Sequence, residues 1–248
     1  MSAITETGTV FTRELRPVLR DPFSVVFSMI QPLVFLGLFA PLLPDVGAAG
    51  STLQWFVPGI VVMACLFSTS FTGSNLLFEI ESGAHERMLV TPLSRPALIV
   101  GRALKEIVPL VIQTAIIVAA CVPFGFDLHL GGVALGLLIL TIMAVGLGAL
   151  SYTLALASKD QHWLFWTVQQ TVLFPLLLLA GILLPLDDGP GWLRTTAQFN
   201  PLSYVVDAER ALFSGIYDAD TLIAGMVAAA VVAAMGLTAG TRAMRTSS

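Results

Sequence analysis

The residues whose types and spacing could do chemistry are concentrated in one polar insert, residues 79–106. Apolar stretches of membrane-spanning length flank this insert on both sides. Charged groups held between two such stretches can dock a soluble partner and pass its motion into the membrane; a solvated connecting loop is the simpler alternative. The charged side chains of the insert are Glu79, Glu81, Glu86, Arg87, Arg95, Arg102, Lys105 and Glu106.

The order of residues within the insert predicts two helices with a sharp break between them. Apolar and small positions recur at helical spacing in its first half, at Ile80, Ala84 and Met88. This helix should stop before Pro92, because the residue preceding a proline is driven out of the helical region. Ser94 and Pro96 are typical of the cap and the first turn of a following helix.

Several other chemistries are excluded by missing patterns. The chain has no GxxxxGK[ST] loop for ATP and no GxSxG serine elbow. His85-Glu86 begins a zinc-protease pattern, but Leu89 stands where the second histidine is required. Cys65 and Cys121 both lie within apolar runs, without metal-ligand spacing. We therefore predict no catalytic residue, no metal site and no cofactor bound by this chain.

The composition predicts an all-α polytopic membrane protein. Of 248 residues, 56% are hydrophobic and 11% are charged, against about 25% charged in soluble domains. Six stretches are apolar for the roughly 20 residues that a helix needs to cross a bilayer: 23–43, 56–78, 107–126, 132–157, 163–184 and 221–240. None has an Asp, Glu, Lys, Arg or His in its interior, which argues against an ion-coupled transporter.

Basic residues predict the orientation of these spans. Ten of the twelve lie before the first span, in the second and fourth connections, or after the last span. Because basic residues mark the cytoplasmic side, both termini and the insert should be cytoplasmic. Residues 1–22 form an amphipathic pattern, with Arg13, Arg16 and Arg20 on one face, and predict a helix in the membrane interface.

Uncharged polar residues within the spans are candidates for lining a translocation path. These are Asn75, Gln113, Gln169 and Gln170. The alternative is that they hydrogen-bond between helices, at about 1 kcal/mol per bond. The GxxxG pairs Gly132/Gly136 and Gly236/Gly240 permit close helix packing and are weak evidence for a dimer face.

The last external segment, residues 185–220, is too long for a turn and too apolar for a free loop. It predicts two short helices that lie on or dip into the outer leaflet, with Asn200-Pro201 at the start of one. Trp192 and Tyr204 suit the membrane interface, where amphipathic rings are favoured.

Two blocks of the sequence resemble a known family. EIESGAHERMLVTPLSR, at residues 79–95, is similar to the coupling-helix segment of type-2 ABC transporter permeases, above all the daunorubicin-resistance-type drug efflux permeases. AGILLP at 180–185, PGWL at 190–193 and NPLSY at 200–204 resemble the same family's signature. The resemblance covers the whole chain and implies a single transmembrane domain over residues 1–248, with 1–22 as interface helix, 79–96 as coupling segment and 185–220 as external helices.

The resemblance also implies partners. Two permease subunits, identical or related, would enclose the path, and two copies of a separate ATPase would bind ATP and Mg²⁺ beneath them. The residues implied in ATPase coupling are Glu81, Gly83, Glu86, Arg87, Leu89, Thr91 and Pro92. Those implied in the external gate are Pro185, Trp192, Asn200, Pro201 and Tyr204.

The expected function is therefore export of a hydrophobic small molecule or lipid across a bacterial cell membrane, with no nucleic-acid partner. Two alternatives remain open at this point. One is a permease for polysaccharides or lipid-linked glycans, whose members tend to line the path with aromatic residues; here only Trp163, Phe165 and Trp166 suggest such a lining. The other is a membrane anchor or sensor that docks a cytosolic protein without transport.

Overall fold

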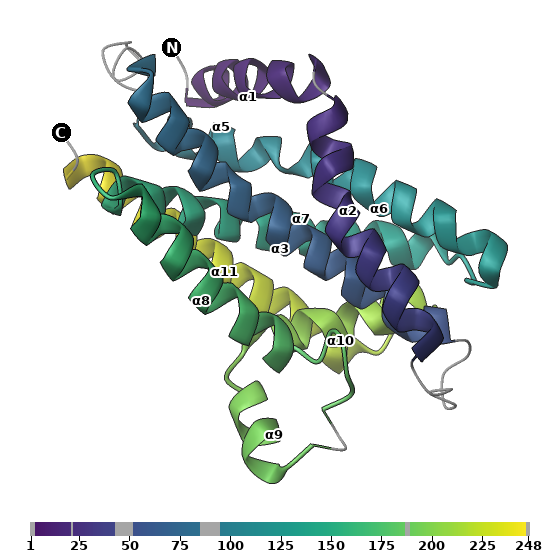
Figure 1. The fold of residues 1–248 in the computed structure, drawn as a ribbon. Helices are drawn as coiled ribbons and strands as arrows, with labels where there is room; N and C mark the ends of the chain where they lie inside the picture. Colours follow the sequence, from purple (N-terminus) through teal and green to yellow (C-terminus); the bar gives the residue numbers. More distant parts are fainter. Residues whose placement is uncertain (1–2, 21, 43–51, 85–94, 187–188, 247–248) are drawn as a thin grey trace.

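The computed structural model describes residues 3–20, 22–42, 52–84, 95–186 and 189–246. Within these ranges the chain is helical and has no strand (Figure 1). The helices are α1 (Ala3–Arg20), α2 (Pro22–Phe39), η1 (Ala40–Leu42), α3 (Thr52–Glu81), α5 (Arg95–Lys105), α6 (Ile107–Cys121), η2 (Val122–Phe124), α7 (Leu130–Ala157), α8 (His162–Leu179), α9 (Gly191–Ala197), α10 (Pro201–Phe213) and α11 (Ala219–Thr246).

The predicted polytopic all-α architecture is confirmed. Five helices in the described part of the chain are long and apolar enough to cross a membrane: Thr52–Glu81, Val100–Phe124, Leu130–Ala157, His162–Leu179 and Ala219–Met244. The first predicted span, 23–43, coincides with α2 and η1, whose described apolar stretch, Met29–Leu42, is shorter. The two short helices predicted within residues 185–220 are α9 and α10.

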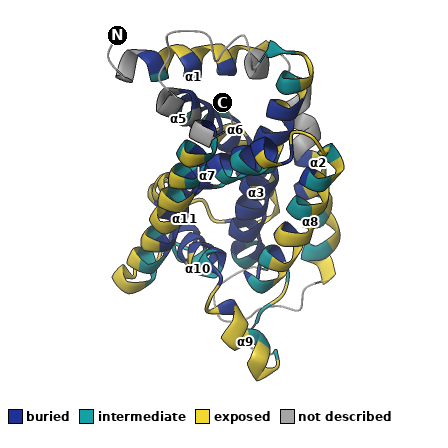
Figure 2. Cartoon of the chain, turned by 90° about the vertical axis from the view of Figure 1, so that its left-hand side faces the viewer, coloured by how far each residue is buried: buried dark blue, intermediate teal, exposed yellow. Residues whose placement is uncertain are grey.

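The helices form a bundle with two distinct ends (Figure 1). Helix α1 lies across one end, where the C-terminal part of α11 also lies, and α9 projects from the opposite end. We refer to these as the α1 end and the α9 end. Helix α3 runs through the middle and is buried along most of its length (Figure 2). The bundle therefore packs around α3, with α2, α6, α7 and α10 against it.

Glycines allow the most extensive contact of the bundle, between α7 and α11. A Cβ atom on Gly146 would lie 2.6 Å from the backbone of Val232 and Ala233, so only glycine permits this approach. Gly236 meets Gly146 from the other side, and Gly132 and Gly136 face α10. Gly132, Gly136 and Gly236 of the GxxxG pairs thus serve packing within one chain, where the sequence had suggested a dimer face.

The predicted third span, 107–126, begins where α6 begins, at Ile107, but the membrane-length helix extends further toward the N-terminus. The prediction placed Arg102, Lys105 and Glu106 outside the span, whereas the helical chain passes from α5 through Glu106 into α6, and the apolar helix begins at Val100. All three side chains are buried. The prediction that the spans have no charged residue in their interior is therefore wrong for this helix. Its charged turn lies within the bundle, where other helices cover it.

Candidate functional site

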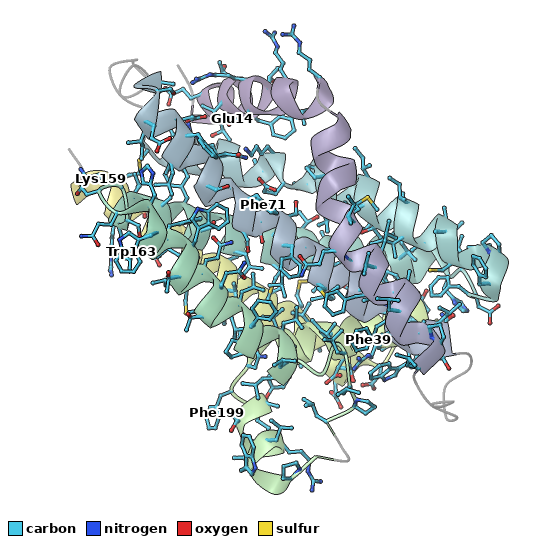
Figure 3. All side chains as sticks on the ribbon, in the orientation of Figure 1. Glu14, Phe39, Phe71, Lys159, Trp163 and Phe199 are labelled. Carbon is cyan, nitrogen blue, oxygen red and sulfur yellow. The ribbon has the colours of Figure 1, made fainter. Side chains whose placement is uncertain are left out.

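Five charged residues from α1, the end of α3 and the α5–α6 helix meet where α1 packs on the bundle, and we call them the ionic cluster: Glu14, Glu79, Arg102, Lys105 and Glu106. Arg102 Nε lies 3.2 Å from Glu14 Oε1, and its Nη2 pairs with Glu79. Lys105 Nζ lies 3.7 Å from Glu14 Oε2 and 4.0 Å from Glu106 Oε1. Figure 3 labels Glu14, which lies beneath α1.

The local sequence explains why these groups meet. Arg102 and Lys105 are three residues apart and so share one face of α5. Glu14 shares the buried face of α1 with Val10, four residues earlier. Gly101 lets α1 approach, because a Cβ atom there would lie 2.7 Å from Val10 Cβ. The close contact of α1 with α5 thus brings the Glu14 carboxylate onto both basic groups.

Hydroxyl groups from α3 and α7 complete the cluster. Glu106 accepts hydrogen bonds from Thr72 (2.7 Å) and Ser68 (3.4 Å), both on α3. Arg102 Nη1 donates to the hydroxyl of Tyr152 on α7 (3.2 Å), and its guanidinium carbon lies 5.1 Å from the centre of that ring. The cluster therefore ties α1, α3, the α5–α6 helix and α7 together through buried polar contacts.

A buried ionic network of this kind favours one relative arrangement of its helices. Removing any one charge leaves the others without compensation in a medium of low polarity, which is costly. A displacement of α1 or of the end of α3 must then be shared by α5 and α6. The cluster is therefore suited to transmit motion from this end of the bundle into the membrane helices.

Of the predicted coupling residues, Glu81 and Gly83 belong to the described chain. Glu81 ends α3, and its Oε1 lies 2.7 Å from His162 Nδ1 at the start of α8. Gly83 has φ +66°, a left-handed conformation that favours glycine and turns the chain out of the helix. The others, Glu86, Arg87, Leu89, Thr91 and Pro92, lie outside the described residues. Their role stays a prediction.

The three arginines predicted on one face of the N-terminal helix, Arg13, Arg16 and Arg20, are exposed on α1. They lie on the side of α1 that turns away from Glu14 and the cluster. The segment is thus a helix with one charged, exposed side and one side buried against α5.

The four candidate path-lining residues do not come together. Asn75 on α3 and Gln170 on α8 are exposed, Gln169 is half-buried, and Gln113 on α6 is 1% exposed. Exposed aromatic rings accompany Asn75 and Gln170: Phe71 and Trp166 meet edge-on with centroids 6.5 Å apart, and Trp163 lies further along α8 (Figure 3 labels Phe71 and Trp163). An open face of α3 and α8 therefore presents rings and amides, whereas Gln113 is an interior residue.

The α9 end contains a pocket of about 310 Å³, lined by both polar and apolar residues. Arg210 forms one wall: its guanidinium carbon lies 3.8 Å from the centre of the Trp55 ring, and it donates to the carbonyls of Trp55 (3.2 Å) and Gly181 (2.7 Å). The lining residues are Trp55, Ala180, Gly181, Pro185, Leu186, Arg194, Ala197, Gln198, Ser203, Tyr204, Asp207 and Arg210.

The predicted gate residues divide between structural and surface positions. Asn200 caps α10 by accepting from the Leu202 amide (3.1 Å), and Pro201 is the first residue of that helix. Pro185 and Tyr204 line the pocket, and the Tyr204 hydroxyl donates to the Gln198 carbonyl (2.9 Å). Trp192 is 69% exposed on α9. Two of the five thus face the pocket, and two set the start of α10.

Sequence reasoning missed two features of this molecule. It did not pair Glu14 with Arg102, although the four-residue spacing of Val10 and Glu14 opposite the exposed arginines was a usable signal. It also counted Glu209 among the charges of the external segment, residues 185–220, without predicting its burial, whereas this side chain is fully buried in α10. No local pattern reveals that burial, because the residues that cover Glu209 belong to α7 and α3.

Comparison with known proteins gives a consistent result. The family model described as ABC-2 type transporter matches residues 5–214. The chain is 27% identical to the daunorubicin resistance ABC transporter permease protein DrrB1 of Streptomyces coeruleorubidus, over 86% of this chain and 77% of that protein. It is 30% identical to the putative transport permease ycf38 of Pyropia yezoensis (87% and 76%), and 24% identical to the probable multidrug ABC transporter permease YbhR of Escherichia coli K12 (64% and 44%).

Proposed function

Because the chain belongs to the ABC-2 type transporter family, we propose that it is the membrane subunit of an ATP-driven exporter of hydrophobic small molecules. The observation that carries the proposal is the ionic cluster, which joins the end of α3 to the α5–α6 helix on either side of the predicted coupling segment. The names of its relatives, which refer to daunorubicin resistance and multidrug transport, support export of a drug-like substrate.

The α1 end is proposed to face the cytoplasm. The exposed Arg13, Arg16 and Arg20, together with Lys159 and Arg242, lie in segments of this end, and basic residues mark the cytoplasmic side of membrane helices. The bacterial cell membrane is the proposed location, on the strength of relatives in Streptomyces and Escherichia.

Residues 79–96 are proposed as the segment that binds the ATPase. Two copies of this ATPase would bind ATP and Mg²⁺ and close against each other. A push on this segment acts directly on Glu79 at the end of α3 and on Arg102 in α5, which form an ion pair. Because Arg102 also pairs with Glu14, α1 would move with them. The permease would in this way convert ATPase closure into a tilt of the membrane helices.

The translocation path is proposed to form between two permease copies, along the open face of α3 and α8. The exposed rings of Phe71, Trp163 and Trp166 provide apolar contact area there, and Asn75 and Gln170 add hydrogen-bonding groups without charge. Such a surface suits a hydrophobic solute with a few polar groups. Because aromatic rings could also line a path for glycans, the choice of a drug-like substrate rests on the names of the relatives. The α10 and α9 helices would close the outer end of this path.

A pull-down tests the proposal most directly. The tagged protein is purified from mild detergent, and co-purifying proteins are identified by mass spectrometry. We expect a soluble ATPase in fixed ratio, and we expect the charge reversal Glu86→Lys with Arg87→Glu to release it without loss of membrane insertion. A matched reversal at the α9 end, Arg194→Glu with Asp220→Lys at two exposed positions, should leave the ATPase bound.

Two results would count against this function. If the Glu86/Arg87 variant retains the ATPase and full transport, the coupling segment is misassigned. If no ATPase accompanies the protein under several mild conditions, the anchor or sensor alternative becomes the better account.

A further inference from the structure

Glu209 is a buried carboxyl group that the proposed export mechanism does not use. It lies on the inner face of α10, with 0% of its surface exposed. Neither of its carboxylate oxygens has a hydrogen-bond partner. Buried polar groups are nearly always hydrogen-bonded, and an isolated buried charge costs far more than a neutral group. The site therefore favours the neutral acid, with a proton on one oxygen.

The surroundings of Glu209 offer a proton site rather than a metal site. Gly136 of α7 lies directly against its carboxyl group, where a Cβ atom would collide with Oε2, and Phe213 lies beside it. Among the described residues, the titratable side chain whose charge interacts with that of Glu209 is the Cys65 thiol of α3. The described residues contain no group of three metal-ligating side chains. A metal ion would thus lack the further oxygen or nitrogen ligands that it needs.

Other titratable or charged groups of the elements packed around α10 lie elsewhere. On α10 itself, Asp207 is 64% exposed and Arg210 turns to the Trp55 ring. Tyr152 is 16 residues from Gly136 along α7, about 24 Å at helical rise. The remaining described ones are Glu79 and Glu81 of α3, His162 of α8, and Asp220 and Arg242 of α11, all near helix ends, and Tyr204 of α10, whose hydroxyl donates to the Gln198 carbonyl. His129, the residue before α7, is closer: its Nδ1 lies 3.1 Å from the Phe213 carbonyl at the end of α10. Among the described residues, no opposite charge pairs with the Glu209 carboxyl group.

Polar contacts hold α10 in place around this carboxyl group. Asn200 Nδ2 donates to the Leu176 carbonyl of α8 (2.8 Å), and Ser203 donates to the Leu179 carbonyl (3.0 Å). Arg210 donates to the carbonyls of Trp55 and Gly181 at the same end. These contacts hold the ends and the outer face of α10 in place. On its inner face, Glu209 packs against α7. The carboxyl group can reach water only if α10 separates from α7.

We propose that Glu209 is a proton-binding site whose occupancy depends on the position of α10. With α10 seated against α7, the carboxyl group holds its proton. When α10 separates, the O–H bond breaks, the proton passes to water, and the carboxylate becomes hydrated. Rebinding of a proton is then required before α10 can return. With the α9 end outside the cell, as proposed above, this proton exchanges with the external solution.

The direction and size of the pH effect follow from the burial. Desolvation raises the pKa of Glu209 from an ordinary 4.5 to about 8 while α10 is seated. In the separated state the hydrated group returns to its ordinary pKa. The equilibrium constant for separation should therefore rise about tenfold per pH unit between these two values and level off above the higher one.

Hydrogen exchange of α10 in the purified full-length protein tests the coupling. Protection factors, corrected for the intrinsic pH dependence of exchange, are measured by mass spectrometry from about pH 6 to about pH 9. We expect the protection of α10 amides such as Val205 and Val206 to fall by at least tenfold over this range. In Glu209→Gln and Glu209→Met, which cannot ionise, protection should not change with pH. Asp207→Asn, on the exposed side of the same helix, should behave as wild type.

Infrared difference spectroscopy between the same two pH values tests proton binding itself. Wild type should show loss of a protonated carboxyl band at high pH, and both Glu209 variants should lack this band. An ionised Glu209 at the lower pH would overturn the proposal, and so would an equal fall in α10 protection in wild type and in both variants. These readouts need no ATPase or substrate, so their failure is distinguishable from failure of the export function.

Discussion

Replacement of Arg102 by methionine should destabilise the protein more than any exposed charge change. Arg102 is 3% exposed and faces two carboxylates, Glu14 at 3.2 Å and Glu79 in closer contact. Methionine fills a similar volume without charge. The variant therefore leaves Glu14, which is 9% exposed, with Lys105 alone as its basic neighbour, and leaves Glu79 without its Arg102 partner.

The size of this effect follows from the burial. Removing one partner of a buried ion pair typically costs about 3–5 kcal/mol, because the other charge stays in a medium of low polarity. An exposed pair contributes about 0–1 kcal/mol. For a chain of this length, about 3–5 kcal/mol corresponds to a fall in Tm of roughly 6–20 °C. Arg16→Met, on the exposed side of α1, is the matched control and should change Tm little.

Thermal unfolding in detergent can be followed with a thiol-reactive dye, because Cys65 and Cys121 are both buried and become reactive on unfolding. The double variant Arg102→Met with Glu14→Gln should recover part of the lost stability, since it removes the charge that was left behind. A loss below about 1 kcal/mol for Arg102→Met, or a double variant less stable than the sum of the single ones, would refute the buried-network account.

Three further predictions concern packing and helix ends. Gly146→Leu should disrupt the contact of α7 with α11, because even a Cβ would lie 2.6 Å from backbone atoms; folded yield and Tm should both fall, while Gly37→Leu, with open space around it, should be tolerated. Asn200→Ala removes the cap of α10 and its bond to the Leu176 carbonyl, and should cost about 1–2 kcal/mol in the same thermal assay. Hydrogen bonds from Thr221 lower the pKa of Asp218. The ionised carboxylate therefore stabilises the folded state at pH values above the ordinary pKa of an aspartate, and this stabilisation is lost as the pH falls through the lowered pKa. On acidification, Asp218→Asn should lose less stability than wild type in the thermal assay.

The sequence alone was sufficient for the architecture, because span length and hydropathy are local properties. Stretches such as 132–157 and 221–240 lie within α7 and α11, and the Asn200-Pro201 pair starts α10 as expected. The family followed from short motifs at fixed positions along the chain, and these also need no tertiary contact to be recognised.

The sequence misled where charged residues border a span. Arg102, Lys105 and Glu106 interrupt the apolar pattern and so were predicted to lie outside the span, in the cytosolic insert, but the membrane-length helix continues through them. Hydropathy assigns each charge a cost as if it faced lipid. It cannot register that Glu14, Glu79 and Thr72, distant in sequence, supply compensating charges and hydrogen bonds.

The sequence by itself determined that this is a polytopic helical permease of the ABC-2 family, since length, apolar runs and motifs are written along the chain. Only the tertiary structure decided which charged groups are buried and with what partners. Arg102 pairs with two carboxylates, whereas the carboxyl group of Glu209 has no hydrogen-bond partner among the described residues. The physical reason is that the rotation and depth at which helices pack decide which side chains meet. Contacts between distant segments, such as Gly101 on Val10 and Gly136 on Glu209, set this rotation and depth.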